Sequence, residues 1–147
     1  MKPLKNVCIV LACVSLLAGQ FGCKTAESLV TSVQFSQTAY DTDKALKADS
    51  LALVARAKNG TPYTGVAADV EQLMMKIDQA IGTEQGRTKN GPTVAQWKKI
   101  KKQLSSLFDL WKTKGSLSPA FANDASSQVS GLFDILIKTE NDKRTQS

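Results

Sequence analysis

Carboxylates are the side chains of this sequence that could act as acids, bases or metal ligands, because the 147-residue chain contains no histidine. Without histidine, neither a Ser-His nor a Cys-His nucleophile pair can form, and the commonest metal ligand is missing. One acidic group, Asp41, Asp43 and Asp49, lacks the glycine and the final glutamate of a calcium-binding loop. We interpret these aspartates as helix caps and solvated side chains.

A second acidic group, formed by Asp69, Glu71, Asp78 and Glu84, could in principle supply the paired carboxylates of a hydrolase. Such an enzyme needs two acidic groups facing each other across a cleft. The spacing here instead predicts positions on exposed helix faces, and no glycine-rich, aromatic-rich loop offers a substrate groove. We therefore predict that the protein is not an enzyme and has no catalytic residue, metal site or cofactor.

The segment WKKIKKQLSSLFDLWK, which spans residues 97–112, combines basic and apolar side chains at helical spacing. A basic amphipathic helix with tryptophans can lie on an anionic surface. The alternative is that the apolar side faces a core and the lysines face solvent, and the sequence favours this alternative. The candidate surface-binding residues are Trp97, Lys98, Lys99, Lys101, Lys102 and Lys112. Lysines can also contact nucleic acid, but we expect no nucleic-acid partner, because the first residues of the chain have the layout of an export signal.

That export signal occupies the first residues, MKPLKNVCIVLACVSLLAGQFGC. Lys2 and Lys5 form a basic front and are followed by the uncharged run 7–18, which is the layout of a secretory signal peptide. The run is shorter than the ~20 residues that a membrane-spanning helix needs. We predict a signal peptide over residues 1–22 and one domain over residues 23–147.

The end of this region, with Gly22 before Cys23, resembles the bacterial lipoprotein precursor class, in which the cysteine after the cleavage site is acylated. Gln20 departs from the aliphatic residue usual for that class. All three cysteines lie within the first 23 residues, so the rest of the chain has no thiol for a disulfide. The resemblance implies lipid attachment at Cys23. Two alternatives stay open: processing at Cys13, and ordinary cleavage near residues 18–19.

The remaining chain alternates helical patterns with short breaks, and no stretch has the period-two alternation of a strand. Three breaks bring proline to the start of an apolar-periodic segment, as expected in a first helical turn. The predicted helical regions are 26–57, 62–81, 92–114 and 119–139. In the first region, which could be one helix or two, an alanine seam is predicted to meet a neighbouring helix; its members are Ala45, Ala48, Ala52 and Ala55. Residues 140–147 are predicted to be a short disordered tail.

Helices joined by short loops pack against their neighbours in antiparallel order. We therefore predict an all-α fold, an antiparallel up-and-down bundle of three to four helices. The net charge of +6, from 19 basic and 13 acidic side chains, is a mild basic bias that does not identify a partner.

The expected function is that of a non-catalytic, lipid-anchored helical bundle of the bacterial cell envelope with a structural or adaptor role. Its expected partners are the membrane, through the N-terminal lipid, and another envelope protein. Lys24 after Cys23 implies, by the lipoprotein resemblance, an outer-membrane location facing the periplasm. The alternative is a module that binds anionic lipid or cell-wall polymer through helix 92–114. A small secreted inhibitor or immunity factor is a third hypothesis, for which the sequence contains no signature.

Overall fold

The computed structural model describes residues 33–145. The predicted signal peptide and Cys23 lie outside the described residues, so both stay predictions. The described residues form four long helices and two short 3-10 turns, with no strand among them. The elements are α1 (Gln37–Lys58), η1 (Tyr63–Gly65), α2 (Ala67–Gln85), α3 (Gly91–Lys114), α4 (Pro119–Asp142) and η2 (Lys143–Thr145).

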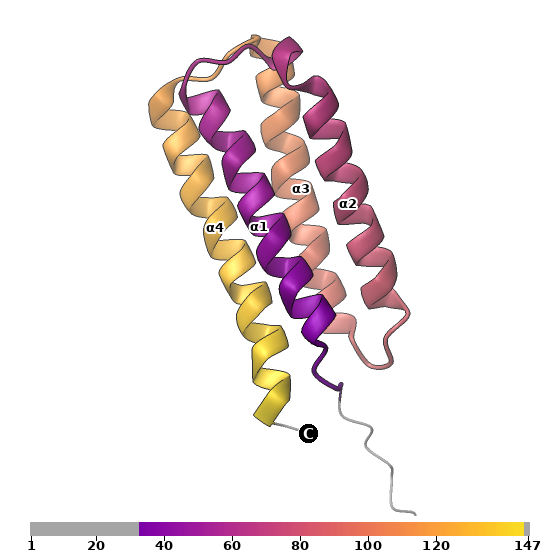
Figure 1. Ribbon diagram of the computed structural model, residues 1–147. Coiled ribbons are helices and arrows are strands. Elements are labelled where there is room, and N and C mark those ends of the chain that lie inside the picture. The colour runs from indigo at the N-terminus through magenta and orange to yellow at the C-terminus, as the bar shows by residue number, and fades with distance from the viewer. Residues whose placement is uncertain (1–32, 146–147) are drawn as a thin grey trace, which may run out of the picture. The chain divides into compact units, whose positions relative to one another are not determined.

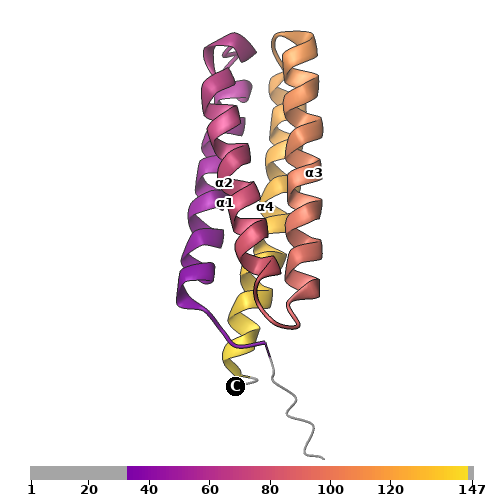
Figure 2. The same cartoon turned by 90° about the vertical axis from the view of Figure 1, so that its right-hand side faces the viewer.

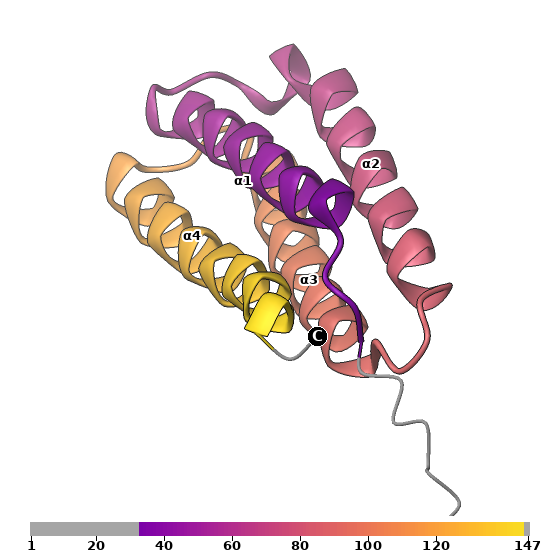
Figure 3. The same cartoon turned by 60° about the horizontal axis from the view of Figure 1, so that its bottom comes forward.

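The four helices alternate in direction along the chain, as Figures 1 and 2 show. Each helix packs against the one before and the one after it, and α4 closes the ring by packing along α1. Figure 3 shows this ring obliquely from the end where α1 begins and α4 ends. The prediction of an all-α, up-and-down bundle is confirmed, with four helices.

The core is formed by the apolar faces of all four helices. Trp97 and Phe133 are fully buried and meet edge-to-face, with ring centroids 5.7 Å apart. At the opposite end of the bundle, the indole Nε1 of Trp111 donates to the carbonyl of Thr61 at 3.1 Å. Burying a large apolar side chain contributes ~1.5–3 kcal/mol, so these faces stabilise the bundle.

Short polar segments set where the helices begin and end. The side chain of Ser36 caps α1 by accepting from the backbone N–H of Ala39 at 3.2 Å, and Ser118 caps α4 just before Pro119. Gly115 ends α3 with φ of +74°, a conformation that side chains with a Cβ rarely adopt. Its carbonyl accepts from the N–H of Tyr63 at 2.9 Å, which ties the end of α3 to η1.

Three helices have boundaries that differ from the prediction. The first region was predicted to be helical from residue 26, but residues 33–36 are not helical and α1 begins at Gln37. From there α1 is one helix that runs without a break through residues 41–43. α2 begins at Ala67 rather than at residue 62 and continues through Gly82 to Gln85. α4 extends to Asp142, followed by η2, so residues 140–145 are not the disordered tail that we predicted.

The prediction of an alanine seam is wrong as well. Ala45, Ala48, Ala52 and Ala55 are all exposed. The buried face of α1 lies around the helix from them and is formed by Ala39, Asp43, Leu46, Ser50, Leu53, Val54 and Ala57. Alanine is a strong helix former on any face of a helix. The spacing of these alanines therefore did not indicate where α1 contacts its neighbours.

Candidate functional site

Four charged side chains gather inside the bundle at the end where α1 begins and α4 ends. Glu84 is in the last turn of α2, Arg87 follows in the α2–α3 loop, Glu140 is near the end of α4, and Lys143 is in η2. Glu84, Glu140 and Lys143 are 3%, 0% and 5% exposed. Charged residues are almost never this buried unless they are paired. We call these four residues the buried ion network.

Arg87 is the centre of the network. Its guanidinium donates to both carboxylate oxygens of Glu84, at 3.0 and 2.8 Å, and to both of Glu140, at 3.1 and 2.8 Å. It also donates to the backbone carbonyl of Gln34 at 2.5 Å. The planar fork of arginine suits such paired contacts. One side chain thus connects α2, α4 and the segment that precedes α1.

Lys143 connects the network to α3. Its ammonium donates to Glu140, to the side-chain oxygen of Asn90 at 2.8 Å and to the hydroxyl of Thr93 at 3.1 Å. The amide of Asn90 donates in turn to the Glu84 side chain and, at 3.2 Å, to the Glu84 carbonyl. The network therefore joins α2, α3 and α4 at this end of the bundle.

The network also holds the segment 33–36. The backbone N–H of Ser36 donates to Glu140 Oε1 at 2.8 Å. The guanidinium of Arg144 lies over the ring of Phe35, 4.0 Å from its centroid, and 5.4 Å from that of Tyr40. The point where the chain enters the bundle is thus fixed to the C-terminal end of α4.

The contacts of Arg87 and Glu140 determine the protonation states of both side chains. Although burial alone would raise the pKa of Glu140, hydrogen bonds from Arg87 and Lys143 hold this pKa below its ordinary value. Burial would lower the pKa of Arg87, but its hydrogen bonds to Glu140 and the charge of Glu84 raise it above the ordinary value. Both groups are therefore charged in the folded protein at neutral pH.

Asp43 lies beside this network but is not hydrogen-bonded into it. It is 2% exposed, and its Oδ2 atom has no hydrogen-bond partner among the described residues. Burial, helped by the negative charges of Glu84 and Glu140 and opposed by Lys143 and Arg87, raises the pKa of Asp43 from 3.8 to about 8. At neutral pH this carboxyl is mostly protonated, which is unusual for an aspartate.

A cavity of about 460 Å³ lies between α1 and α2 next to this carboxyl. Asp43, Ala80 and Trp97 are among its buried lining residues, and Thr42, Asp49 and Lys76 are among those nearer to solvent. Asp49 and Lys76 form an ion pair of 2.9 Å that joins the two helices. Pockets of 300–1,000 Å³, roughly, are the usual size for small-molecule ligands.

Within residues 33–145, the chain has no cysteine or histidine that could be activated, and no three acidic side chains are grouped to hold a metal ion. What the site offers is a buried neutral carboxyl beside a cavity, supported by a fixed set of charges.

The six candidate surface-binding residues of segment 97–112 have different environments in the structure. Trp97 is fully buried, so its assignment as a surface-binding residue is wrong: the ring packs on Phe133 in the core. Lys101 pairs with Asp78 of α2 at 2.5 Å. The other four lysines, Lys98, Lys99, Lys102 and Lys112, are exposed and form no ion pair with another described residue.

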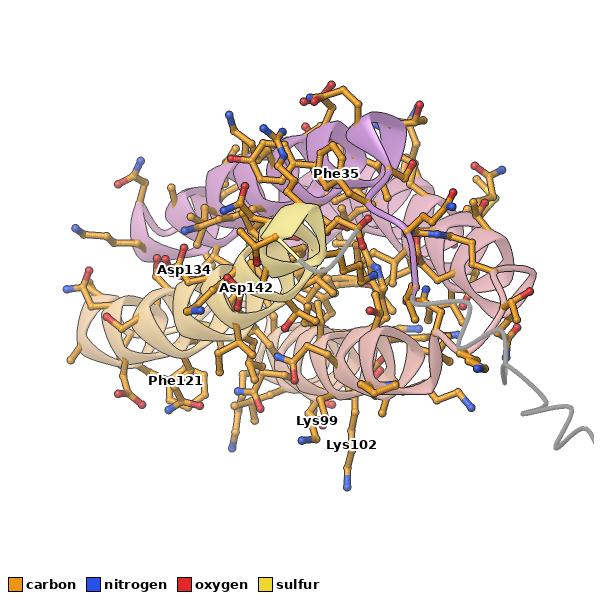
Figure 4. The ribbon with its side chains drawn as sticks, turned by 90° about the horizontal axis from the view of Figure 1, so that it is seen from below. Phe35, Lys99, Lys102, Phe121, Asp134 and Asp142 are labelled. Carbon is orange, nitrogen blue, oxygen red and sulfur yellow. The ribbon has the colours of Figure 1, made fainter. Side chains whose placement is uncertain are left out.

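Figure 4 shows Lys99 and Lys102 projecting from the outer side of α3, away from the other helices. Phe121 of α4, which is 41% exposed, projects from the bundle in the same direction. We call Lys98, Lys99, Lys102 and Lys112 the basic face.

The sequence analysis missed the buried ion network and Asp43, which we had interpreted as a cap or solvated residue. Glu84, predicted to be exposed, is buried. The signal that could have found them is register: the core positions of α1 at 39, 46, 50, 53 and 57 follow steps of three and four that include Asp43. Glu84 and Glu140 continue the same steps after Ile77 and Ala80 in α2 and after Phe133 and Leu136 in α4.

Comparison with known proteins finds no matching family model, no matching curated protein and no matching solved structure. Among the described helices, none has a stretch long and apolar enough to cross a membrane.

Proposed function

We propose that the chain is an exported, lipid-anchored and non-catalytic helical bundle of the bacterial cell envelope, with a structural or adaptor role. The support comes from two parts of the chain. The N-terminal sequence resembles a lipoprotein precursor up to Cys23. The bundle that follows holds four charged side chains in the buried ion network and contains no thiol or imidazole within its described residues.

The observation that carries the proposal is the attachment of segment 33–36 to the buried ion network. Cys23 precedes Val33 by only ten positions in the sequence. A lipid on Cys23 would therefore pull on a segment held by Arg87 and Glu140 rather than on a loose helix end. Such an attachment point suits a tethered module that must stay folded while it binds an envelope protein.

Mass spectrometry of the native protein tests this proposal. We expect an N-terminus at Cys23 carrying acyl chains, and a Cys23→Ser variant that remains unacylated. Crosslinking in intact envelopes should then recover a stoichiometric protein partner with the acylated form. An N-terminus at residue 1 or near residues 18–19, without acyl chains, would contradict the lipid anchor.

A second candidate function, binding of anionic lipid or cell-wall polymer, is favoured by the basic face. Its lysines have no acidic partner among the described residues, so their charge is available to an anionic surface. The burial of both tryptophans means that a tryptophan emission shift would be a poor signal for this binding. Co-sedimentation with phosphatidylglycerol vesicles is the better assay.

The matched comparison uses two triple variants of equal charge change. Changing Lys98, Lys99 and Lys102 to Gln should reduce vesicle binding roughly 100-fold, since each lysine near an anionic surface contributes about 1 kcal/mol. Changing the exposed lysines 44, 58 and 89 to Gln removes the same charge elsewhere. An equal loss in both variants would mean that only net charge matters, and would argue against a specific surface on α3.

A further inference from the structure

Two residues that line the cavity between α1 and α2 each carry a buried polar atom whose hydrogen-bonding needs the described residues do not meet. Asp43 Oδ2 and the indole Nε1 of Trp97 are both buried without a hydrogen-bond partner among those residues. Both residues line the same cavity. Leaving a buried polar atom unsatisfied costs roughly 1–3 kcal/mol, so each such atom in a folded protein calls for an explanation.

The charges around Asp43 show which kind of group would meet these needs. Glu84 of α2 and Glu140 of α4 bring two negative charges, while Arg87 of the α2–α3 loop and Lys143 of η2 bring two positive ones. With Asp43 protonated, these five groups sum to zero; with Asp43 ionised, they carry one uncompensated negative charge. A buried charge is stable only when it is paired. The group that would allow Asp43 to ionise is therefore a cation placed in the cavity.

We propose that this cavity binds a small molecule carrying a primary ammonium group, which donates to Asp43 Oδ2 while the rest of the molecule lies along the apolar part of the lining. That part includes Ala39, Leu46 and Ala80. A hydroxyl or carbonyl oxygen on the same molecule could accept from Trp97 Nε1. With Asp43 protonated, an anionic ligand would face two negative groups, Asp49 and Glu84, and two positive ones, Lys76 and Arg87, so it would gain no net attraction. A neutral alcohol would leave the charge balance unchanged.

Binding must release a proton. Without ligand, the Asp43 carboxyl is mostly protonated at pH 7, because burial raises its pKa to about 8. When the ammonium ion enters, the carboxyl gives its proton to the buffer and the ion pair forms. Close to one proton should therefore be released per ligand at pH 7, and affinity should rise up to tenfold per pH unit until about pH 8.

The experiment is isothermal titration calorimetry of the full chain with three probes of equal length: hexylammonium, hexanol and hexanoate. We expect binding of hexylammonium at least tenfold tighter than that of the other two. Titration in two buffers of different ionisation enthalpy measures the proton release. Equal affinity for hexylammonium and hexanol, or binding without proton release at pH 7, would overturn the proposal.

Two variants locate the site. Asp43→Asn keeps the shape of the protonated carboxyl but cannot ionise, and should lower hexylammonium affinity at least tenfold. Asp41→Asn is the matched control, because Asp41 is exposed on the same helix and does not line the cavity; its binding should be unchanged. Unaltered binding by a folded Asp43→Asn variant would refute the assignment. If this variant does not fold, the proposal is tested on the unaltered chain by the affinities of the three probes and by the proton release.

This inference does not depend on the proposed lipid anchor. Ammonium binding concerns the cavity beside Asp43, which lies within the described bundle, whereas the anchor concerns Cys23. An unacylated Cys23→Ser protein should bind hexylammonium as the unaltered chain does, so failure of one proposal leaves the other standing.

Discussion

Replacing Arg87 by Met tests whether the buried ion network stabilises the bundle. Arg87 makes five hydrogen bonds, to Glu84, Glu140 and the carbonyl of Gln34. Methionine keeps much of the aliphatic volume but leaves the carboxylate of Glu140, which is fully buried, with one cation fewer. Removing one partner of a buried ion pair costs about 3–5 kcal/mol, and we expect Arg87→Met to lie in this range.

The matched control is Arg56→Met. Arg56 pairs with Asp69, but the two side chains are 43% and 52% exposed. Exposed ion pairs contribute about 0–1 kcal/mol, so the same substitution should have little effect there.

Urea unfolding followed by far-UV circular dichroism measures both variants. With a slope of about 1–3 kcal/mol/M, the unfolding midpoint of Arg87→Met should fall by 1 M or more, roughly, while that of Arg56→Met should move by a few tenths. The reasoning would be refuted if the two variants lost similar stability, or if Arg87→Met stayed within about 1 kcal/mol of the unaltered chain.

The remaining predictions concern the C-terminus and the two tryptophans. Deleting residues 140–147 removes Glu140 and Lys143 and should destabilise the bundle by about 3 kcal/mol or more in urea; a truly disordered tail could be removed without loss. Trp111→Phe should cost about 1 kcal/mol more than Trp97→Phe, because only Trp111 loses a hydrogen bond, to Thr61. Equal losses would contradict that assignment. The tryptophan emission of the folded chain should be blue-shifted in buffer, since both rings are fully buried, and it should move to the red in urea.

Apolar periodicity predicted the fold well because burial of large side chains dominates the choice of helix face. In α3, the large apolar residues at helical spacing are all buried: Trp97, Ile100, Leu104, Leu107, Phe108 and Trp111. Proline and glycine marked the loops for a related reason, since proline suits a first helical turn and Gly115 adopts positive φ. These signals depend only on residues close together in the sequence, so they can be recognised in a single sequence.

The buried polar groups could not be predicted by the same logic. Asp43, Glu84, Glu140 and Lys143 are residue types that normally lie at the surface. The burial of Glu140 and Lys143 depends on partners far away in the chain, since Arg87 and Asn90 each lie 53 residues before the group that they contact. The sequence shows only that the acidic residues continue the steps of three and four between core residues. Charged residues near the end of such a pattern are easily interpreted as the exposed end of a helix.

The alanine seam of α1 shows the opposite error. Ala45, Ala48, Ala52 and Ala55 share a spacing that would suit a close helix contact, but small side chains add little buried area. Leu46, Leu53 and Val54 bury far more, and they determine which face of α1 is turned inward.

The central claim is that Asp43 is a buried carboxyl whose ionisation would leave it and its neighbours, Glu84, Glu140, Arg87 and Lys143, with one unbalanced negative charge. A carboxyl whose pKa rises from 3.8 unfolded to about 8 folded binds more protons in the folded state between these values. The free energy of unfolding therefore falls as pH rises through this range and levels off above about pH 8. Glu140 acts in the opposite direction: its lowered pKa contributes stability that is present above its ordinary value of 4.5 and lost in acid. Together they predict greatest stability near pH 5, roughly.

The most direct test compares the free energy of unfolding of the unaltered chain and of Asp43→Asn at pH 5 and pH 9. Between these values the unaltered chain should lose up to about 4 kcal/mol through Asp43, at about 1.4 kcal/mol per pH unit below the folded pKa. The amide that replaces the carboxyl cannot ionise, so the variant should lack this loss and be the more stable protein at pH 9. Parallel pH curves for the two proteins would contradict the account.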